Sequence, residues 1–507
     1  MSLTARYPVS GDTTSPVVTA SIVRNVRLQY VRAIAALAVL FFHASVIVER
    51  STGSDSFLTV FSGLWGAYGV SVFFALSGYL MGELIQRDDP ARFLIARIAR
   101  IYPPMLLTVA LFWVAFFAAG YTRGIDLLSL TLAPIGARDY FLAVEWSLIY
   151  EMSYYVALAV LSFLGRRRQA VWVAVAWLVA VISSIWTHGI GRNDSLPIAS
   201  ELFLQAINLP FIIGFILADL SRRRLLPPRI ILLAIPAVLV VGYGLPGDTG
   251  LKIIVLGVLT VAVAICLPKT APDSALGRLG ERLGDASYML YLCHMPLMWL
   301  LMVIVLPGLP ALSVWLGGVA ASVLLSLVLA PLDLGIHRWS RQMIARASDL
   351  RVRAVAIGFI AVFCGVTVFS ELVVRDKRAA LQQAHRIILT TKPAASPSLR
   401  AEIDAVERMT DGTMIVRGYV VDLENPTLGV HAAAIQSDRI LVLDPAKRMR
   451  PALAKALARP DLERRRIGFV LTLPKVDCAA GRIEFRAALS DGRTVVPDIS
   501  PNIDICR

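Results

Sequence analysis

Among the ionisable side chains inside long apolar segments of the 507-residue chain, we expect four to matter for chemistry, namely Arg32, His43, Glu151 and His294. Ionisable groups in such segments are costly and usually mark a functional site. Histidine is the usual general base near neutral pH, a carboxylate can orient its ring, and arginine can hold an anionic group. These residue types point to proton transfer beside an anionic substrate.

Arg32 and His43 are eleven residues apart. At about 100° per residue this is roughly three helical turns, so both side chains project from one face, about 16 Å apart along the axis. Arg32 could instead extend toward the lipid headgroups, and His43 could be an interior histidine bonded to a backbone carbonyl. Their shared face favours a common site.

Glu151 belongs to a polar and aromatic stripe with Ser147, Tyr154 and Tyr155, spaced at helical intervals. From the expected helix ends, Glu151 and His43 lie roughly 20 and 22 Å above the same membrane face, so we expect them to meet. The alternative is a structural carboxylate bonded to tyrosines. Glu145, at the outer boundary, is expected to be exposed.

His294 shares a helix face with Ser287 and Tyr291, and Pro296 loosens the backbone beside them. We treat Tyr291 and His294 as candidate substrate-site residues, together with Ser147 and Tyr154 of the Glu151 stripe. A histidine that only packs is the alternative for His294.

In the segment 92–103, apolar residues alternate with arginines, which predicts a helix lying in the inner membrane interface. Arg97 and Arg100, one turn apart, could clamp phosphates. The alternative is that these arginines only anchor the segment on the cytoplasmic side.

The elements that position these residues are predicted from composition. The chain is 57% hydrophobic and 17% charged, with a mean hydropathy of +0.67. This excludes a single soluble protein and a disordered or collagen-like chain. The net charge of +14 would suit nucleic acid only if the basic residues formed a stripe on a soluble face, but they form short clusters between apolar runs. We therefore expect a polytopic membrane protein.

Eleven runs are long enough to cross a membrane, at residues 28–48, 61–86, 101–120, 143–164, 170–187, 199–219, 229–245, 250–267, 286–306, 311–335 and 354–374. The first run starts late and lacks a cleavage site, so we do not expect a signal peptide. The short connections carry 22 Lys and Arg residues on one side and about four on the other. The positive-inside rule then places residues 1–27 in the cytoplasm and residues 375–507 outside it.

The C-terminal region has a different character. We expect a linker at 375–400 and a small β-rich domain at 401–507, with alternating segments at 413–422, 430–443, 467–473 and 482–489. Asp411-Gly412 and Asp491-Gly492 suit hairpin turns, and a short helix is expected around 445–459. Cys478 and Cys506 could form a disulfide if this domain is exported. The chain has no metal-binding motif, so no metal is expected.

Five segments together resemble the acyltransferase 3 family of integral membrane acyltransferases. They are Arg32 to His43 with ten residues between them, Gly69–Gly78, Arg97–Pro103, Trp146–Glu151 and Ser287–Pro296.

The resemblance covers roughly residues 25–340 and implies a transmembrane acyltransferase domain of ten helices at 28–345, so the span at 354–374 would be additional. Cys293 and Tyr150 depart from the family pattern at positions not expected to do chemistry. The C-terminal region lies outside the family core and has no Gly-Asp-Ser nucleophile signature, so we expect no hydrolase there.

The family moves an acyl group, commonly acetyl, from cytoplasmic acyl-coenzyme A to a carbohydrate at the outer face, here across a bacterial inner membrane. The resemblance implies that Arg32 and His43 are essential, that Arg97 and Arg100 handle the donor, and that Glu151 supports the site.

We expect His43 to take the proton of the acceptor hydroxyl while Glu151, directly or through a tyrosine, orients its ring as in a catalytic triad. An acyl-histidine intermediate is the open variant. The acceptor could be O-antigen, exopolysaccharide or another envelope glycan. The alternative function is a proton-coupled transporter or flippase of a lipid-linked glycan, but no internal repeat supports it.

Overall fold

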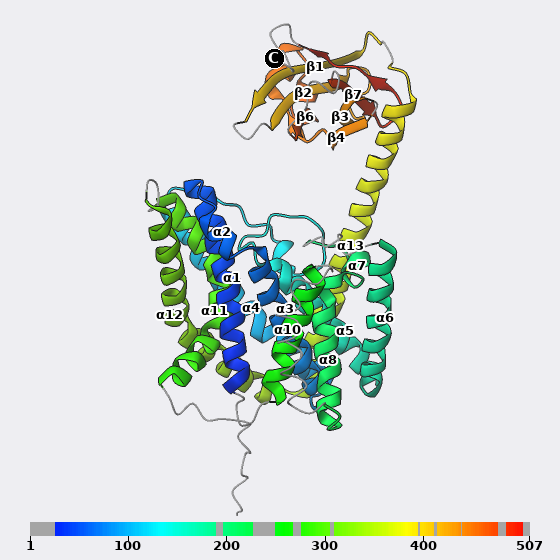
Figure 1. Ribbon diagram of the computed structural model, residues 1–507. Coiled ribbons are helices and arrows are strands. Elements are labelled where there is room, and N and C mark those ends of the chain that lie inside the picture. Colours follow the sequence, from blue (N-terminus) through cyan, green and yellow to red (C-terminus); the bar gives the residue numbers. More distant parts are fainter. Residues whose placement is uncertain are drawn as a thin grey trace, which may run out of the picture. The chain divides into compact units, whose positions relative to one another are not determined.

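The computed structural model describes residues 26–188, 196–226, 249–266, 275–304, 309–393, 396–409, 413–437, 439–474 and 483–499 (Figure 1). Contacts divide the chain into two compact units, Met1–Thr367 and Val368–Arg507. The first is a helical bundle, here called the helical unit, and the second, the β unit, contains all the named strands.

Among the described connections between the helices of the helical unit, the longest is the loop of residues 119–144. The helices that begin in this unit are α1 (Val26–Thr52), α2 (Ser56–Val60), α3 (Gly63–Arg87), α4 (Pro90–Ala118), α5 (Glu145–Phe163), α6 (Ala170–His188), α7 (Ala199–Leu202), α8 (Leu209–Arg222), α10 (Thr249–Cys266), α11 (Ala275–Ile304), α12 (Ala311–Arg346) and α13 (Asp349–Thr390).

Within the described residues, seven helices are long and apolar enough to cross a membrane: α1, α3, α4, α5, α6, α12 and α13. The segment Gly250–Cys266 of α10 is a shorter apolar helix. The protein is therefore an integral membrane protein, and the predicted combination of a helical membrane bundle with a β-rich domain is confirmed.

Several helices differ from the predicted spans. Helix α4 begins at Pro90, so the arginine-rich segment 92–103 is helical as predicted but is continuous with the following span, and its place in the membrane interface stays a prediction. The predicted span 199–219 is broken into α7, a 3₁₀ turn and α8, which starts with Pro210 in its first turn. The predicted span 229–245 lies outside the described residues.

Helix α1, which carries Arg32 and His43, is held closely by two neighbouring helices. A Cβ atom at Gly69 of α3 would lie 2.5 Å from the carbonyl oxygen of Ala35, and one at Gly284 of α11 would lie 2.4 Å from that of Gln29. Only glycine permits such approaches, as is common between membrane helices. The position of α1 is therefore fixed against both α3 and α11.

Helices α3 and α8 cross in the same way. A Cβ at Gly78 would lie 2.0 Å from the carbonyl oxygen of Phe211, and one at Gly214 would lie 2.0 Å from that of Ala75. Each helix thus contributes a glycine where the backbone of the other passes. This contact holds the helix that supplies one wall of the candidate site.

The β unit contains two sheets, which share one apolar core that includes Ile403, Phe469 and Phe485. The strand orders are β5-β6-β2-β1-β9 and β4-β3-β7-β8, and the β1–β9 pair is parallel whereas the other pairs are antiparallel. The elements are β1 (Leu399–Arg408), β2 (Met414–Asp422), β3 (Val430–Gln436), β4 (Arg439–Pro445), β5 (Arg448–Met449), α14 (Pro451–Ala456), β6 (Arg466–Leu473), β7 (Ile483–Leu489), β8 (Thr494–Val495) and β9 (Asp498–Ile499).

The predicted segment 430–443 contains two strands, β3 and β4, because the chain turns at Ser437, which has a φ of 50°. The turn at Asp491-Gly492 is formed, with a φ of 94° at Gly492. Residues 411 and 412 lie outside the described residues, as do Cys478 and Cys506, whose pairing stays a prediction.

The predicted linker 375–400 is helical for most of its length, because α13 continues to Thr390. Within the β unit, Ala384 and Ile388 of α13 pack against Ala433 and Ile435 of β3. Because α13 covers this face of β3, four successive residues of the strand are buried, whereas buried and exposed residues would alternate in a strand with one face open to solvent. The helix end therefore forms part of the core of the β unit.

Candidate active site

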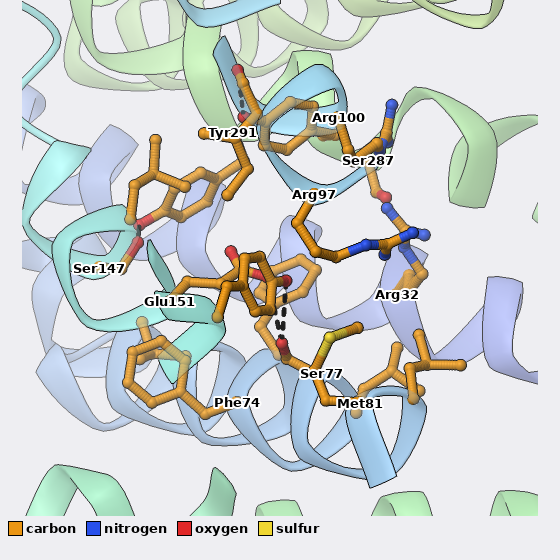
Figure 2. A pocket seen from close by; sticks show the side chains of 18 residues that line it. Arg32, Phe74, Ser77, Met81, Arg97, Arg100, Ser147, Glu151, Ser287 and Tyr291 are labelled. Atoms are coloured by element: carbon orange, nitrogen blue, oxygen red, sulfur yellow. Dashed lines mark hydrogen bonds between the residues drawn. The ribbon is translucent and has the colours of Figure 1, made fainter. Parts of the chain in front are cut away.

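Five helices, α1, α3, α4, α5 and α11, surround a cavity of about 130 Å³, here called the arginine cavity (Figure 2). It is lined by Arg32, Val70, Phe73, Phe74, Leu76, Ser77, Leu80, Met81, Arg97, Arg100, Ile101, Ser147, Leu148, Glu151, Tyr155, Ser287, Tyr288 and Tyr291. The structure thus brings Arg32, Arg97, Arg100, Glu151, Ser147 and Tyr291 of the predicted site to one cavity.

The three arginines of the arginine cavity differ in their partners. Arg100 Nη1 donates to both carboxylate oxygens of Asp333 in α12, at 2.9 and 2.8 Å, and its guanidinium lies 4.7 Å from the centroid of the Tyr288 ring. Arg97 Nε is buried, and neither it nor Arg32 has a hydrogen bond to a described residue. Arg97 and Arg32 are therefore the cations that remain available to a ligand.

Glu151 is the only carboxylate among the described side chains that line this cavity. Its Oε1 accepts hydrogen bonds from Ser77 Oγ, at 3.1 Å, and from the hydroxyl of Tyr155 (Figure 2). Both donors suit an ionised carboxylate. Because Arg100 is already paired with Asp333, Arg32 and Arg97 face the single carboxylate of Glu151 in this cavity, and this excess of positive charge favours an anionic ligand.

His43 and His294 form a pair beyond the Tyr291 end of the cavity. His43 Nδ1 lies 2.9 Å from His294 Nε2, and the His294 ring lies 6.0 Å from the Tyr291 ring, centroid to centroid. Among the described residues, no hydrogen bond joins His43 to Glu151. The predicted contact between them is therefore replaced by a histidine–histidine contact.

The other stripe residues of α5 separate into two groups. Ser147 Oγ lies 2.6 Å from the Tyr291 hydroxyl at the cavity wall. Tyr154 lies away from the cavity, where its hydroxyl donates to Asn208 Oδ1 at 2.6 Å and its ring stacks on Phe211. Consecutive residues of a helix point about 100° apart, so Tyr154 and Tyr155 occupy opposite edges of a broad stripe.

Sequence reasoning misplaced or missed three residues in or beside the site. Glu145 is 2% exposed, not exposed as predicted, and its Oε1 accepts the backbone N–H of Leu142. Asp333 and Ser77 were not predicted. Asp333 could have been found, because it is an ionisable residue inside a predicted span. Ser77 gave no such signal, since an uncharged hydroxyl is common in membrane helices.

A second cavity of about 760 Å³, here called the loop cavity, is formed mainly by the loop 119–144. Its lining combines charged groups of both signs with aromatic rings, and includes Arg123, Asp126, Arg138, Asp139 and Trp146. Arg138 Nη1 donates to Asp126 Oδ2 at 2.8 Å. Trp146 and Ser147 are consecutive residues, so the first turn of α5 faces both cavities.

Comparison with known proteins places this bundle among the membrane-bound acyltransferases. Residues 25–331 match the acyltransferase domain of the acyltransferase 3 family. The match covers more than half of the chain, and the protein therefore belongs to this family and is an acyltransferase. Asp333 lies just beyond the matched residues.

Two relatives match over part of the chain. The exopolysaccharide production protein ExoZ of Rhizobium meliloti (strain 1021) is 27% identical over 259 residues, which are 45% of this chain and 75% of the relative. Nodulation protein 10 of Rhizobium leguminosarum bv. viciae is 24% identical over 216 residues, 38% of this chain and 58% of the relative. No solved structure matches the chain significantly.

Proposed function

We propose that the protein transfers a short acyl group, acetyl in the simplest case, from acyl-coenzyme A to a hydroxyl of an exported carbohydrate. The observation that carries this proposal is the excess of arginine over carboxylate in a cavity next to a histidine pair. The name of the relative ExoZ supports an exopolysaccharide as the acceptor. Membership of an acyltransferase family argues against the transporter or flippase alternative.

The donor is proposed to occupy the arginine cavity. Arg97 would hold its phosphates, because this guanidinium has no partner among the described residues, whereas Arg100 is already paired with Asp333. Arg32 would hold the pantetheine arm or polarise the thioester carbonyl. The volume of about 130 Å³ is below the roughly 300–1,000 Å³ of typical ligand pockets, so the cavity would take only the part of the donor that lies beside these guanidinium groups.

His43 is proposed to be the general base, three turns beyond Arg32 along α1. Its Nε2 takes the proton of the acceptor hydroxyl while the hydroxyl oxygen attacks the thioester carbonyl. The tetrahedral intermediate then collapses with cleavage of the carbon–sulfur bond, and the proton returns from His43 to the leaving thiolate. The products are the acyl ester and free coenzyme A, so atoms and charge balance.

The acceptor is proposed to occupy the loop cavity. Aromatic rings beside paired charged groups suit a sugar, because the rings cover its apolar faces and the charged groups bind its hydroxyls. Trp146 lines this cavity while the next residue, Ser147, lines the arginine cavity. The first turn of α5 would then separate donor from acceptor.

The positive-inside pattern supports an orientation with the N-terminus in the cytoplasm and the β unit on the opposite side of a bacterial inner membrane. In that orientation the β unit would position the acceptor glycan or a partner, without chemistry of its own. A Cys478–Cys506 disulfide would be possible only there.

Mass spectrometry of envelope glycans from cells with and without the gene tests the function. We expect one glycan to lose an acyl substituent in the deletion strain, and the wild-type gene, but not His43→Ala, to restore it. Purified protein in proteoliposomes should then transfer labelled acetyl from acetyl-coenzyme A to that glycan. An unchanged set of acyl substituents would contradict the proposal.

A further inference from the structure

The histidine pair has a defined hydrogen-bonding environment. His294, which is 1% exposed, is placed by α11, with its Nδ1 3.0 Å from the carbonyl oxygen of Leu290 one turn earlier. Its other nitrogen, Nε2, lies 2.9 Å from His43 Nδ1. His43 is half-buried, its ring also contacts the backbone of Val39 one turn earlier, and no side chain of a described residue hydrogen-bonds to its Nε2.

These contacts determine where the protons lie. A carbonyl oxygen can only accept a hydrogen bond, so His294 Nδ1 carries a proton and donates it to Leu290. A neutral imidazole has one N–H, which makes His294 Nε2 an acceptor. His43 Nδ1 must then be the donor, and His43 Nε2 is left with its lone pair.

The opposite assignment would place a cation in the bundle. If His294 Nε2 donated to His43, His294 would carry two protons, because its Nδ1 still faces the Leu290 carbonyl. No carboxylate of a described residue hydrogen-bonds to either ring. A buried charge without a partner is strongly unfavourable, so the neutral arrangement is preferred.

We propose that His294 is a positioning residue, which fixes the tautomer of His43 so that Nε2 is free to act on the substrate. The inference rests on the proposed role of His43 as the base. It assigns to a neutral histidine the place that a carboxylate occupies in a catalytic triad. Glu151 accepts hydrogen bonds from Ser77 and Tyr155, so it does not orient the His43 ring in this arrangement.

The arrangement also supports the proton transfer itself. When His43 Nε2 takes the proton of the acceptor hydroxyl, positive charge develops on the ring, and the bond from its Nδ1–H to His294 Nε2 becomes a stronger, charge-assisted bond. No proton needs to pass to His294. The same tautomer would serve an acyl-histidine variant, because attack on the thioester also requires the lone pair on Nε2.

Two substitutions of His294 separate positioning from packing. His294→Gln keeps an acceptor near the Nε2 position, whereas His294→Phe keeps the ring volume without an acceptor. We expect His294→Phe to lower kcat by about 10- to 100-fold with an unchanged donor KM, which is smaller than the 10²–10⁴-fold loss typical when a general base itself is removed. His294→Gln should recover most of that loss. Cys293→Ala, the buried neighbour on α11, is the control for packing and should retain normal kcat.

Nitrogen-15 NMR of the histidine-labelled full-length protein in detergent reads the tautomer directly and requires no activity. The His43 signals, assigned by their loss in His43→Ala, should show a protonated Nδ1 and an unprotonated Nε2 in the wild type, and a redistribution in His294→Phe. A wild-type His43 with its proton on Nε2, or a His294→Gln variant as impaired as His294→Phe, would overturn the proposal. An active His43→Ala variant would instead overturn the proposed mechanism, with the tautomer measurement still valid.

Discussion

Asp333 holds Arg100 through both of its carboxylate oxygens, although the two residues are 233 positions apart and belong to α4 and α12. Arg97, one turn before Arg100 on α4, has no such partner among the described residues. A sequence motif with two arginines therefore contains one residue available to a ligand and one that joins helices.

This difference predicts distinct effects of the two arginines. Arg97→Gln should weaken binding of coenzyme A by about tenfold or more, as expected for loss of a charged hydrogen bond, and leave thermal stability unchanged. Arg100→Gln should destabilise the helical unit by about 3–5 kcal/mol, because it leaves Asp333 buried without its partner. Ligand titration and tryptophan-monitored melting in detergent measure the two effects.

The double variant Arg100→Gln/Asp333→Asn is the matched control for that experiment. It removes both charges and should recover part of the stability lost in Arg100→Gln. Equal melting temperatures for Arg97→Gln and Arg100→Gln would contradict this division of roles.

Arg32→Lys should abolish most acyl transfer without loss of expression. Arg32 has no hydrogen bond to a described residue, so its replacement breaks no internal contact, whereas lysine cannot reproduce the planar, forked contacts of a guanidinium. Steady-state kinetics together with membrane yield measure this result. Full activity of the lysine variant would show that only the charge matters.

Gly214→Ala should lower the yield of folded protein strongly. The new Cβ would lie 2.0 Å from the backbone oxygen of Ala75, and two backbones cannot yield as a flexible side chain can. Gly358→Ala in α13 is the matched control, because a Cβ there meets nothing within 4 Å. Similar size-exclusion profiles for the two variants would argue against the close crossing of α3 and α8.

Trp146→Ala should raise the KM for the acceptor and leave the KM for the donor unchanged. The reason is that Trp146 lines the loop cavity but not the arginine cavity. Trp172→Ala, on α6 and 69% exposed, is the control and should change neither value. A Trp146→Ala variant with altered donor KM alone would place the acceptor elsewhere.

The β unit should lose stability in acid because of Asp422. Burial tends to raise the pKa of this carboxyl, but hydrogen bonds from Arg493 and from the backbone of Glu424 outweigh burial and leave the pKa below its usual value. A lowered folded pKa gives stabilisation that is complete above the unfolded pKa of about 3.9 and is lost as the pH falls through the folded value.

Pepsin digestion of the full-length protein between pH 5 and pH 2 measures this loss as cleavage within β2. We expect cleavage to increase below about pH 4 in the wild type. The Asp422→Asn variant should be cleaved more readily at pH 5 and show a weaker dependence on pH. Identical pH profiles would remove Asp422 as the cause.

Much of the helical unit could be predicted because an apolar run of sufficient length has few alternatives in a membrane. The residues at which the helices begin and end could not be predicted in the same way. Helix α11 begins at Ala275, eleven residues before the predicted span, and α13 continues to Thr390. Polar residues end an apolar run, but they do not end a helix whose backbone can still form its hydrogen bonds.

The site was predictable residue by residue but not as a set of contacts. Arg32, Arg97 and Glu151 were each found as ionisable groups in or beside apolar runs, and they line one cavity. The contact of His43 with His294 was not predicted, because the depth of a residue along a helix does not give the rotation of that helix or its neighbours. Which helices meet depends on close glycine contacts such as that of Gly284 in α11 with Gln29 in α1.

The loop cavity is made largely by a segment without regular helices, whereas every residue of the arginine cavity lies on a helix. Loops accept substitution and changes of length more readily than packed helices do. If the loop cavity binds the acceptor as proposed, acceptor preference can diversify among related enzymes while donor use stays constant. Exchanging residues 121–143 between two such enzymes is then expected to transfer glycan specificity.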